Sequence, residues 1–209
     1  VQRLTFTRGP RFPGNCVHIV RCIETDKDTE KMTKTMLITG GSRGIGAATA
    51  RLAATAGYAV CVNYAGNQEA ADAVVSDIVG AGGRAFACQA DVADADQVAA
   101  MFAMVDREFE RLDVLVNNAG ILMGRGHSES VSRERLERVL AVNVIGAFMC
   151  AQQAIRRMST RHGGAGGAIV NVSSRAAVLG APNEYVDYAA SKGAVDSMTV
   201  GMAMEEADH

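Results

Sequence analysis

Short apolar runs alternate with longer, alanine-rich stretches from residue 36 onward. The apolar runs are rich in β-branched residues and have the length of buried strands, whereas the stretches between them are helical in character. This alternation predicts a doubly wound parallel sheet with helices on both faces, an α/β domain of three αβα layers. We expect strands at 36–39, 59–63, 84–89, 113–117 and 168–173, and helices at 45–56, 68–81, 94–110, 132–143, 144–161 and 186–207.

Residues 1–34 do not follow this pattern. They hold two of the three prolines, show no helical or strand period, and lead into the polar run ETDKDTEKMTK. We therefore expect a poorly ordered N-terminal extension, and we assign the domain to residues 35–209. An organellar transit peptide is a weaker alternative, and the longest apolar stretch here, CVHIV, is too short for a secretory signal.

Composition narrows the class of protein. The 209 residues are 48% hydrophobic, which is enough for one core but cramped for two domains. A net charge of −2 argues against a nucleic-acid partner, and no apolar run approaches a membrane-spanning length. The five cysteines and four histidines show no ligand spacing, so we predict no metal site and a reducing, cytoplasmic location.

A glycine-rich turn follows the first predicted strand. TGGSRGIG, residues 39–46, opens the first helix, where a dinucleotide pyrophosphate needs backbone amides and room for close approach. The spacing is not GxGxxG, and glycines also serve tight turns for backbone reasons alone. Its place between a strand and a helix predicts a Rossmann-like nucleotide site. We expect cofactor contacts from Gly40, Ser42, Arg43, Gly44, Ile45 and Gly46.

The charges near the second strand favour NADP(H) over NAD(H). A carboxylate at the end of that strand often holds a free ribose 2′-hydroxyl, but the exit reads VNYAGNQ, with no acid before Glu69. Arg43 could bind a 2′-phosphate, or it could be a solvated loop arginine. We also place Asn63, Asp91 and Val92 at the cofactor, and Asp91 could alternatively cap the helix beginning near residue 94.

A tyrosine and a lysine lie one helical turn apart in YAASK, so Tyr188 and Lys192 share a helix face. Lys192 is the only lysine from residue 35 onward, although the chain has 17 arginines. A free tyrosine is a poor acid or base at neutral pH and needs a cation that stabilises its phenolate. A charge about 4 Å away, at an effective dielectric of about 20, supplies up to about 4 kcal/mol. Tyr188 is therefore the predicted general acid/base.

A serine at the end of the last predicted strand completes the catalytic set. Ser174 ends AIVNVSS, where α/β sheets hold ligands, and its hydroxyl could hydrogen-bond the reacting oxygen. Ser173 is its close competitor. For either serine, the alternative is a strand-end hydroxyl that only caps local backbone.

Taken together, these motifs resemble the short-chain dehydrogenase/reductase family in its single-domain form. TGGSRGIG, NNAG, AVNVIGAF, NVSS and YAASK occur in the family's order between residues 36 and 207. The resemblance implies that residues 117–120 stabilise the central sheet beside the cofactor, with Asn117, Ala119 and Gly120 in contact with it. It also implies that Asn143 supports a water and Lys192 in a proton relay.

The resemblance further implies that Tyr188 and Lys192 contact the cofactor, Lys192 at the nicotinamide ribose, and that Ser174 and Tyr188 flank the substrate carbonyl. The expected activity is an NADP(H)-dependent transfer of hydride to or from a small carbonyl or alcohol compound. A Rossmann-like methyltransferase is disfavoured, because it would give these three residues no joint role.

The end of the chain raises an alternative. Members of the family continue with two more strands and a lid beyond the point where GMAMEEADH ends, so we expect those strands to be missing. One sheet edge would then be unpaired and apolar. The alternative function is accordingly a truncated, non-enzymatic dinucleotide-binding remnant or interaction module.

The last two long helices carry more apolar residues than one sheet face plausibly buries. This surplus predicts a homodimer or homotetramer, with core packing as the alternative. The residues concerned are Phe148, Met149, Ile155, Val195, Met198 and Met202. The loops at 123–126 and 179–184 are the expected substrate pocket, and they do not identify the substrate.

Overall fold

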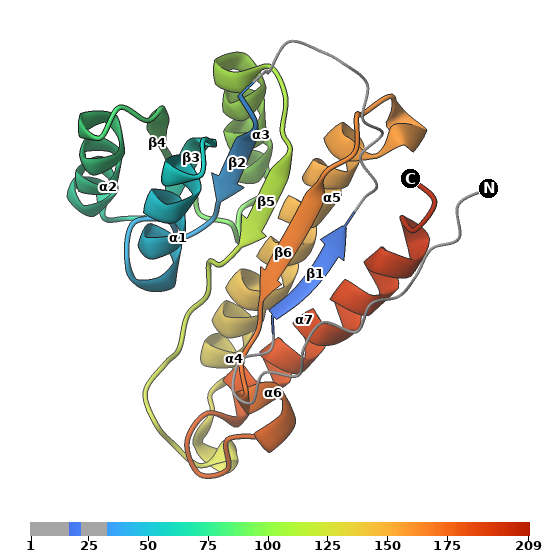
Figure 1. Cartoon of the computed structure of the whole chain (residues 1–209). Coiled ribbons are helices and arrows are strands. Elements are labelled where there is room, and N and C mark those ends of the chain that lie inside the picture. Colours follow the sequence, from blue (N-terminus) through green and yellow to red (C-terminus); the bar gives the residue numbers. More distant parts are fainter. Residues whose placement is uncertain (1–16, 22–32) are drawn as a thin grey trace.

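A single sheet organises the part of the chain that the computed structural model describes, residues 17–21 and 33–209 (Figure 1). The strand order is β1-β6-β5-β2-β3-β4. The five strands predicted from the sequence are present and parallel, each within one residue of its expected ends. They are β2 (Thr35–Ile38), β3 (Ala59–Tyr64), β4 (Ala85–Gln89), β5 (Val114–Asn117) and β6 (Ala168–Val172).

Helices cover both faces of this sheet, which confirms the doubly wound, three-layer prediction. Alanines and aliphatic residues of α1 (Gly44–Thr55) and α2 (Gln68–Gly80) pack on one face against Ile38 and Val62. On the other face, α3 (Ala95–Phe109) and α5 (Ala147–Met158) pack against Leu37 and Leu115. β3 is buried along its whole length, as its apolar run AVCVNY requires of a strand covered on both sides.

The chain reverses its direction of travel across the sheet after β4. From β2 it builds β3 and β4 on one side, then returns to build β5 and β6 on the other. The connections that leave the carboxyl ends of β2 and β5 therefore run in opposite directions, and ligands of open α/β sheets bind in the crevice at such a switch point.

One long helix replaces the two that we predicted at 132–143 and 144–161. It consists of α4 (Arg133–Leu140), a π-helical segment (Ala141–Gly146) and α5. By length and composition this helix of 26 residues could cross a membrane, which corrects our expectation that no run is long enough. Its buried side chains, among them Cys150 and Met158, belong to the core beneath the sheet, which is the setting of an ordinary core helix.

An unpredicted strand lies at the outer edge of β6 (Figure 1). β1 (Val17–Arg21) pairs antiparallel with β6 across its whole length, and α7 (Val186–Glu205) packs beside it. The edge that we expected to be unpaired is therefore covered by β1. The poorly ordered extension at residues 1–34 stays a prediction, and residues 1–16 and 22–32 lie outside the described part of the chain.

Most of the apolar residues assigned to a subunit interface belong to the core instead. Val195 and Met202 are buried, and Met149, Ile155 and Met198 are partly buried against the core beneath the sheet. Phe148 alone of the six is exposed, at 43%. Core packing, the alternative reading, thus accounts for the other five.

Candidate active site

The glycine turn joins β2 to α1 at the switch point. Gly40 has a φ of 61°, a conformation that side chains with a Cβ rarely adopt. At Gly46 an added Cβ would lie 2.4 Å from the carbonyl oxygen of Gly40 and 2.6 Å from Nδ2 of Asn118. Arg43 provides no side-chain cap, and the first turn of α1 holds no acid, so the positive end of the helix is left uncompensated.

A pocket of about 430 Å³ lies over this turn and the carboxyl ends of the neighbouring strands. Nine of the predicted cofactor residues line it directly. Five do not: Gly44, Gly46, Asn117, Tyr188 and Lys192. Sequence reasoning missed the other lining residues, which follow β3 to β5 or lie on the long helix. The lining residues are Gly40, Ser42, Arg43, Ile45, Asn63, Tyr64, Ala65, Gly66, Asn67, Ala90, Asp91, Val92, Asn118, Ala119, Gly120, Ile121, Arg138 and Val142.

Buried amides hold the strand ends and the turn together. Asn63 accepts a hydrogen bond from the backbone N–H of Gly40 at 3.1 Å and donates to the carbonyl oxygen of Ala90 at 3.0 Å. Asn118 donates from Nδ2 to the carbonyl oxygens of Thr39 and Gly40. Their polar groups are thus engaged in shaping the turn, so we assign Asn63 a positioning role there.

Asn117 helps to stabilise the central sheet, as the resemblance implied. Its side chain is buried and donates to the carbonyl oxygen of Ala147 at 3.0 Å and to Oδ1 of Asn171 at 2.9 Å. It does not line the pocket, and its amide links β5 to α5 and β6. The next asparagine, Asn118, is the one that reaches the pocket. The two asparagines differ only in their place relative to the strand: Asn117 is the last residue of β5, and Asn118 follows it.

The charges lining the pocket sum to +1, from two arginines and one aspartate. Arg43 is exposed in the glycine turn. Asp91 is paired with Arg138 of α4 at 2.8 Å and accepts a hydrogen bond from the N–H of Ala93. The N-cap of α3 is Asp94, so the alternative that Asp91 caps that helix is wrong.

Tyr188 and Lys192 face one another from the first turns of α7. Nζ of Lys192 lies 5.7 Å from the centre of the Tyr188 ring and donates to the carbonyl oxygen of Val172 at 2.7 Å. Burial lowers the pKa of Lys192, and the nearby charge of Asp196 partly offsets that effect. Among the described residues, none hydrogen-bonds the hydroxyl of Tyr188, which leaves it available to a ligand.

The two candidate serines are engaged differently. Ser173 donates its hydroxyl proton to the carbonyl oxygen of Lys192 at 3.4 Å. Ser174 accepts from the N–H of Ala176, at the start of α6 (Ala176–Leu179), and keeps its own proton free to donate. Both hydroxyls thus hydrogen-bond local backbone. Ser174 is the one whose hydroxyl proton remains available to donate to a ligand oxygen.

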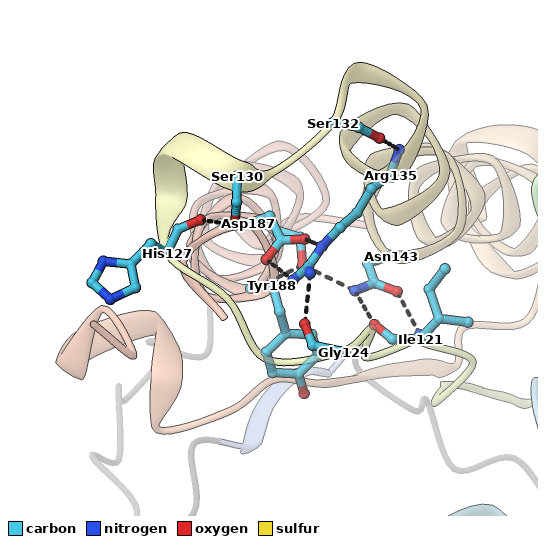
Figure 2. A network of polar contacts seen from close by, with 10 residues as sticks. Ile121, Gly124, His127, Ser130, Ser132, Arg135, Asn143, Asp187 and Tyr188 are labelled. Carbon is cyan, nitrogen blue, oxygen red and sulfur yellow. Dashed lines mark hydrogen bonds and ion pairs between the residues drawn. The ribbon is translucent and has the colours of Figure 1, made fainter. Parts of the chain in front are cut away.

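Asn143 links the pocket wall at Ile121 to α7, the helix that carries Tyr188 (Figure 2). From the π-helical segment it accepts from the N–H of Ile121 at 2.8 Å, and it donates to the carbonyl oxygen of Ile121 and to Oγ of Ser191. A Cβ at Gly120 would lie 3.4 Å from Oδ1 of Asn143 and 3.6 Å from Nζ of Lys192. The pocket wall at Gly120 and Ile121 is therefore adjacent to Asn143 and Lys192. Sequence reasoning missed Ser191.

The described residues contain no group of three histidine, cysteine or acidic side chains that could hold a metal ion. The fold and the site together define an α/β domain with a crevice at the switch point of the sheet, whose wall at Gly120 adjoins a buried lysine. The model of the short chain dehydrogenase family matches residues 34–209. The chain belongs to the short-chain dehydrogenase/reductase family of oxidoreductases.

Similar proteins carry oxidoreductase names. The uncharacterized oxidoreductase YgfF of Escherichia coli is 56% identical over 171 residues, which are 82% of this chain and 69% of that protein. The 3-oxoacyl-(acyl-carrier-protein) reductase FabG of Staphylococcus aureus is 44% identical over 84% of this chain and 69% of its own length. A solved short-chain dehydrogenase/reductase from Serratia marcescens is 37% identical, with a TM-score of 0.77 over 84% of this chain and 69% of that one.

Proposed function

We propose that this chain is an NADP(H)-dependent oxidoreductase that acts on a small carbonyl or alcohol compound, with Tyr188 as general acid/base. The observation that carries the proposal is the buried ammonium of Lys192, which lies beside the Tyr188 ring and close to Gly120 of a pocket built on a glycine turn. Relatives named as 3-oxoacyl reductases support the carbonyl class of substrate.

The pocket fits a dinucleotide. A Cβ at Gly46 would collide with the turn, and the uncapped start of α1 suits a pyrophosphate. The net positive lining and the exposed Arg43 favour a 2′-phosphate, because the exit of β3 offers Asn67 in place of a carboxylate. The bound nicotinamide would supply or accept the hydride.

The residues of the chain would manage the proton and the position of the carbonyl. In the reducing direction Tyr188 gives its hydroxyl proton to the carbonyl oxygen, and in the oxidising direction it takes that proton back. Lys192, fixed by the carbonyl oxygen of Val172, stabilises the phenolate that remains. Ser174 donates a hydrogen bond to the same substrate oxygen, and Asn143 holds the backbone of Ile121 beside it.

Replacing Tyr188 with phenylalanine tests this proposal. Turnover of NADPH with a panel of ketones and aldehydes should fall by about 10²–10⁴-fold, because the acid/base is lost. The Kd for NADPH, measured by nucleotide fluorescence, should stay within about twofold of the native value, since affinity depends on the pocket. Tyr58→Phe, far along the chain from the site, is the matched control and should keep full activity.

Two results would contradict the proposal. Equal turnover of Tyr188→Phe and the native protein would remove Tyr188 from the chemistry. NADPH binding without turnover by the native protein on any carbonyl tested would favour a non-enzymatic dinucleotide-binding module.

We also propose that the chain forms a homo-oligomer and works in the cytoplasm. Exposed apolar side chains on the long helix and α7 support the first part: Ile145, Phe148, Val200 and Met204 are 43% to 73% exposed. The free thiols of Cys61, Cys88 and Cys150 support a reducing compartment. Light scattering would show the mass directly, and a monomer at micromolar concentration would overturn the first part. Microscopy of the tagged protein tests the second, and a non-cytoplasmic signal would overturn it.

A further inference from the structure

A largely buried ion pair lies directly beside the catalytic tyrosine (Figure 2). Arg135 of α4 donates from Nε and Nη2 to the two carboxylate oxygens of Asp187, at 2.7 and 2.9 Å. The side chains are 17% and 3% exposed. Hydrogen bonding from Arg135 lowers the pKa of Asp187, so the pair is charged at neutral pH.

The same guanidinium also holds a third piece of chain. Its Nη1 donates to the carbonyl oxygen of Gly124 at 2.5 Å, in the loop that leaves the pocket at Ile121. Asp187 immediately precedes Tyr188 in the first turn of α7. One planar side chain therefore joins α4, this loop and the start of the catalytic helix.

Further contacts fasten the loop to the segment before α7. The backbone N–H of Gly126 donates to the carbonyl oxygen of Glu184 at 3.1 Å, and Nε of Arg125 donates to the hydroxyl of Tyr185 at 3.0 Å. These contacts are more exposed than the one at Arg135, since the side chains of Arg125 and Glu184 are 72% and 44% exposed. The loop at 121–126 and residues 184–187 are thus held together by a series of contacts. The guanidinium of Arg135, which we call the fork, makes the most buried of them.

Helix stabilisation alone does not account for this arrangement. An acid in the first turn of α7 already interacts favourably with the helix dipole, and it does so in solvent. Burying it against an arginine adds a desolvation cost, which the geometry offsets with paired hydrogen bonds. The third hydrogen bond, from Arg135 to the carbonyl oxygen of Gly124, involves no residue of α7 and so does not stabilise that helix.

We propose that Arg135 is a positioning residue, which sets the first turn of α7 and the loop at 121–126 relative to each other so that the Tyr188 hydroxyl meets the carbonyl substrate. This inference rests on the proposed role of Tyr188. Arg135 does not line the nucleotide pocket, so the effect falls on the carbonyl substrate and leaves NADPH affinity unchanged. A lysine cannot reproduce the fork, because an ammonium lacks the planar bidentate geometry.

The primary test replaces Arg135 with lysine and compares it with Arg133→Lys. Arg133 lies on the same helix and forms an exposed pair with Glu137, with side chains 84% and 61% exposed. For Arg135→Lys, kcat/KM for the carbonyl should fall on the order of 10- to 100-fold, as expected from a misplacement of about 1 Å. Its Kd for NADPH should change by less than about twofold, and Arg133→Lys should match the native protein in both measurements. An unchanged kcat/KM in Arg135→Lys overturns the proposal.

A double variant separates positioning from stability. Arg135→Met alone leaves the charge of Asp187 buried without its partner and should lower Tm. Adding Asp187→Asn removes that charge and should recover much of the Tm, while kcat/KM stays low because the fork is still absent. If activity returns together with Tm, the pair is structural only and the proposal fails.

Hydrogen exchange tests the positioning role without relying on activity. It therefore still applies if the native protein shows no turnover, a result that would contradict the proposed function. The amide of Gly126, within the loop that the fork holds, should exchange at least about tenfold faster in Arg135→Lys than in Arg133→Lys. Equal exchange in the two variants would overturn the positioning role regardless of catalysis.

Discussion

Replacing Gly46 with alanine should damage the nucleotide pocket from behind. The new Cβ would lie 2.4 Å from the carbonyl oxygen of Gly40 and 2.6 Å from Nδ2 of Asn118, about 1 Å closer than an ordinary contact. Relief requires Asn118 to leave the carbonyl oxygens of Thr39 and Gly40, which it holds at 2.9 and 3.0 Å. Two hydrogen bonds at about 1 kcal/mol each, with about 1–3 kcal/mol for overpacking, give a loss of roughly 3–5 kcal/mol in unfolding free energy.

The same displacement moves the turn that would face the pyrophosphate. If about 2 kcal/mol of the loss appears in binding, the Kd for NADPH rises about 30-fold. Urea unfolding and nucleotide fluorescence measure the two quantities. Gly80→Ala is the control, because a Cβ there meets no atom within 4 Å, and it should leave affinity unchanged. Native affinity and stability in Gly46→Ala would refute the close packing on which the argument depends.

Two further substitutions address charge. Arg43→Ala should weaken NADPH binding by about 10- to 100-fold and NADH binding by less than about twofold, because one charge-assisted hydrogen bond to the 2′-phosphate is lost; equal losses for the two nucleotides would argue against that contact. Burial lowers the pKa of Lys192, so the unfolded chain binds more protons than the folded protein between that lowered pKa and 10.5. The unfolding free energy should therefore rise with pH across that window, and Lys192→Met should remove this rise in urea unfolding; an unchanged slope would contradict it.

The five parallel strands could be predicted because each is specified locally. A run such as AVCVNY is apolar on both faces and fits only a strand covered by helices on either side. β1 gave no such signal: its apolar run is short and its partner, β6, lies about 150 residues away in the chain. The π-helical segment was equally hidden, since AVNVIG is compatible with an ordinary helix and its widening depends on contacts made in the folded protein.

The same distinction between local and long-range geometry separates the site residues that the sequence predicted from those that it did not. Tyr188 and Lys192 were found because one helical turn separates them, so their proximity follows from local geometry. The sequence did not predict the roles of Arg138 and of the ion pair between Arg135 and Asp187. The positions of these side chains depend on how α4 is rotated against the sheet and α7. Asn117 and Asn118 show the limit most clearly, since two identical neighbours at one strand end have opposite surroundings.

The proposed nucleotide pocket and the proposed catalytic residues meet at Gly120. A Cβ there would be in ordinary contact with Oδ1 of Asn143 and Nζ of Lys192, at 3.4 and 3.6 Å, so no clash excludes a side chain. A side chain at position 120 would instead fill the space between the pocket and the buried ammonium of Lys192. Lys192 already donates to the carbonyl oxygen of Val172, so under the proposed function a ligand would meet its remaining donors through that space. The lysine can be both buried and accessible because the position in front of it is glycine.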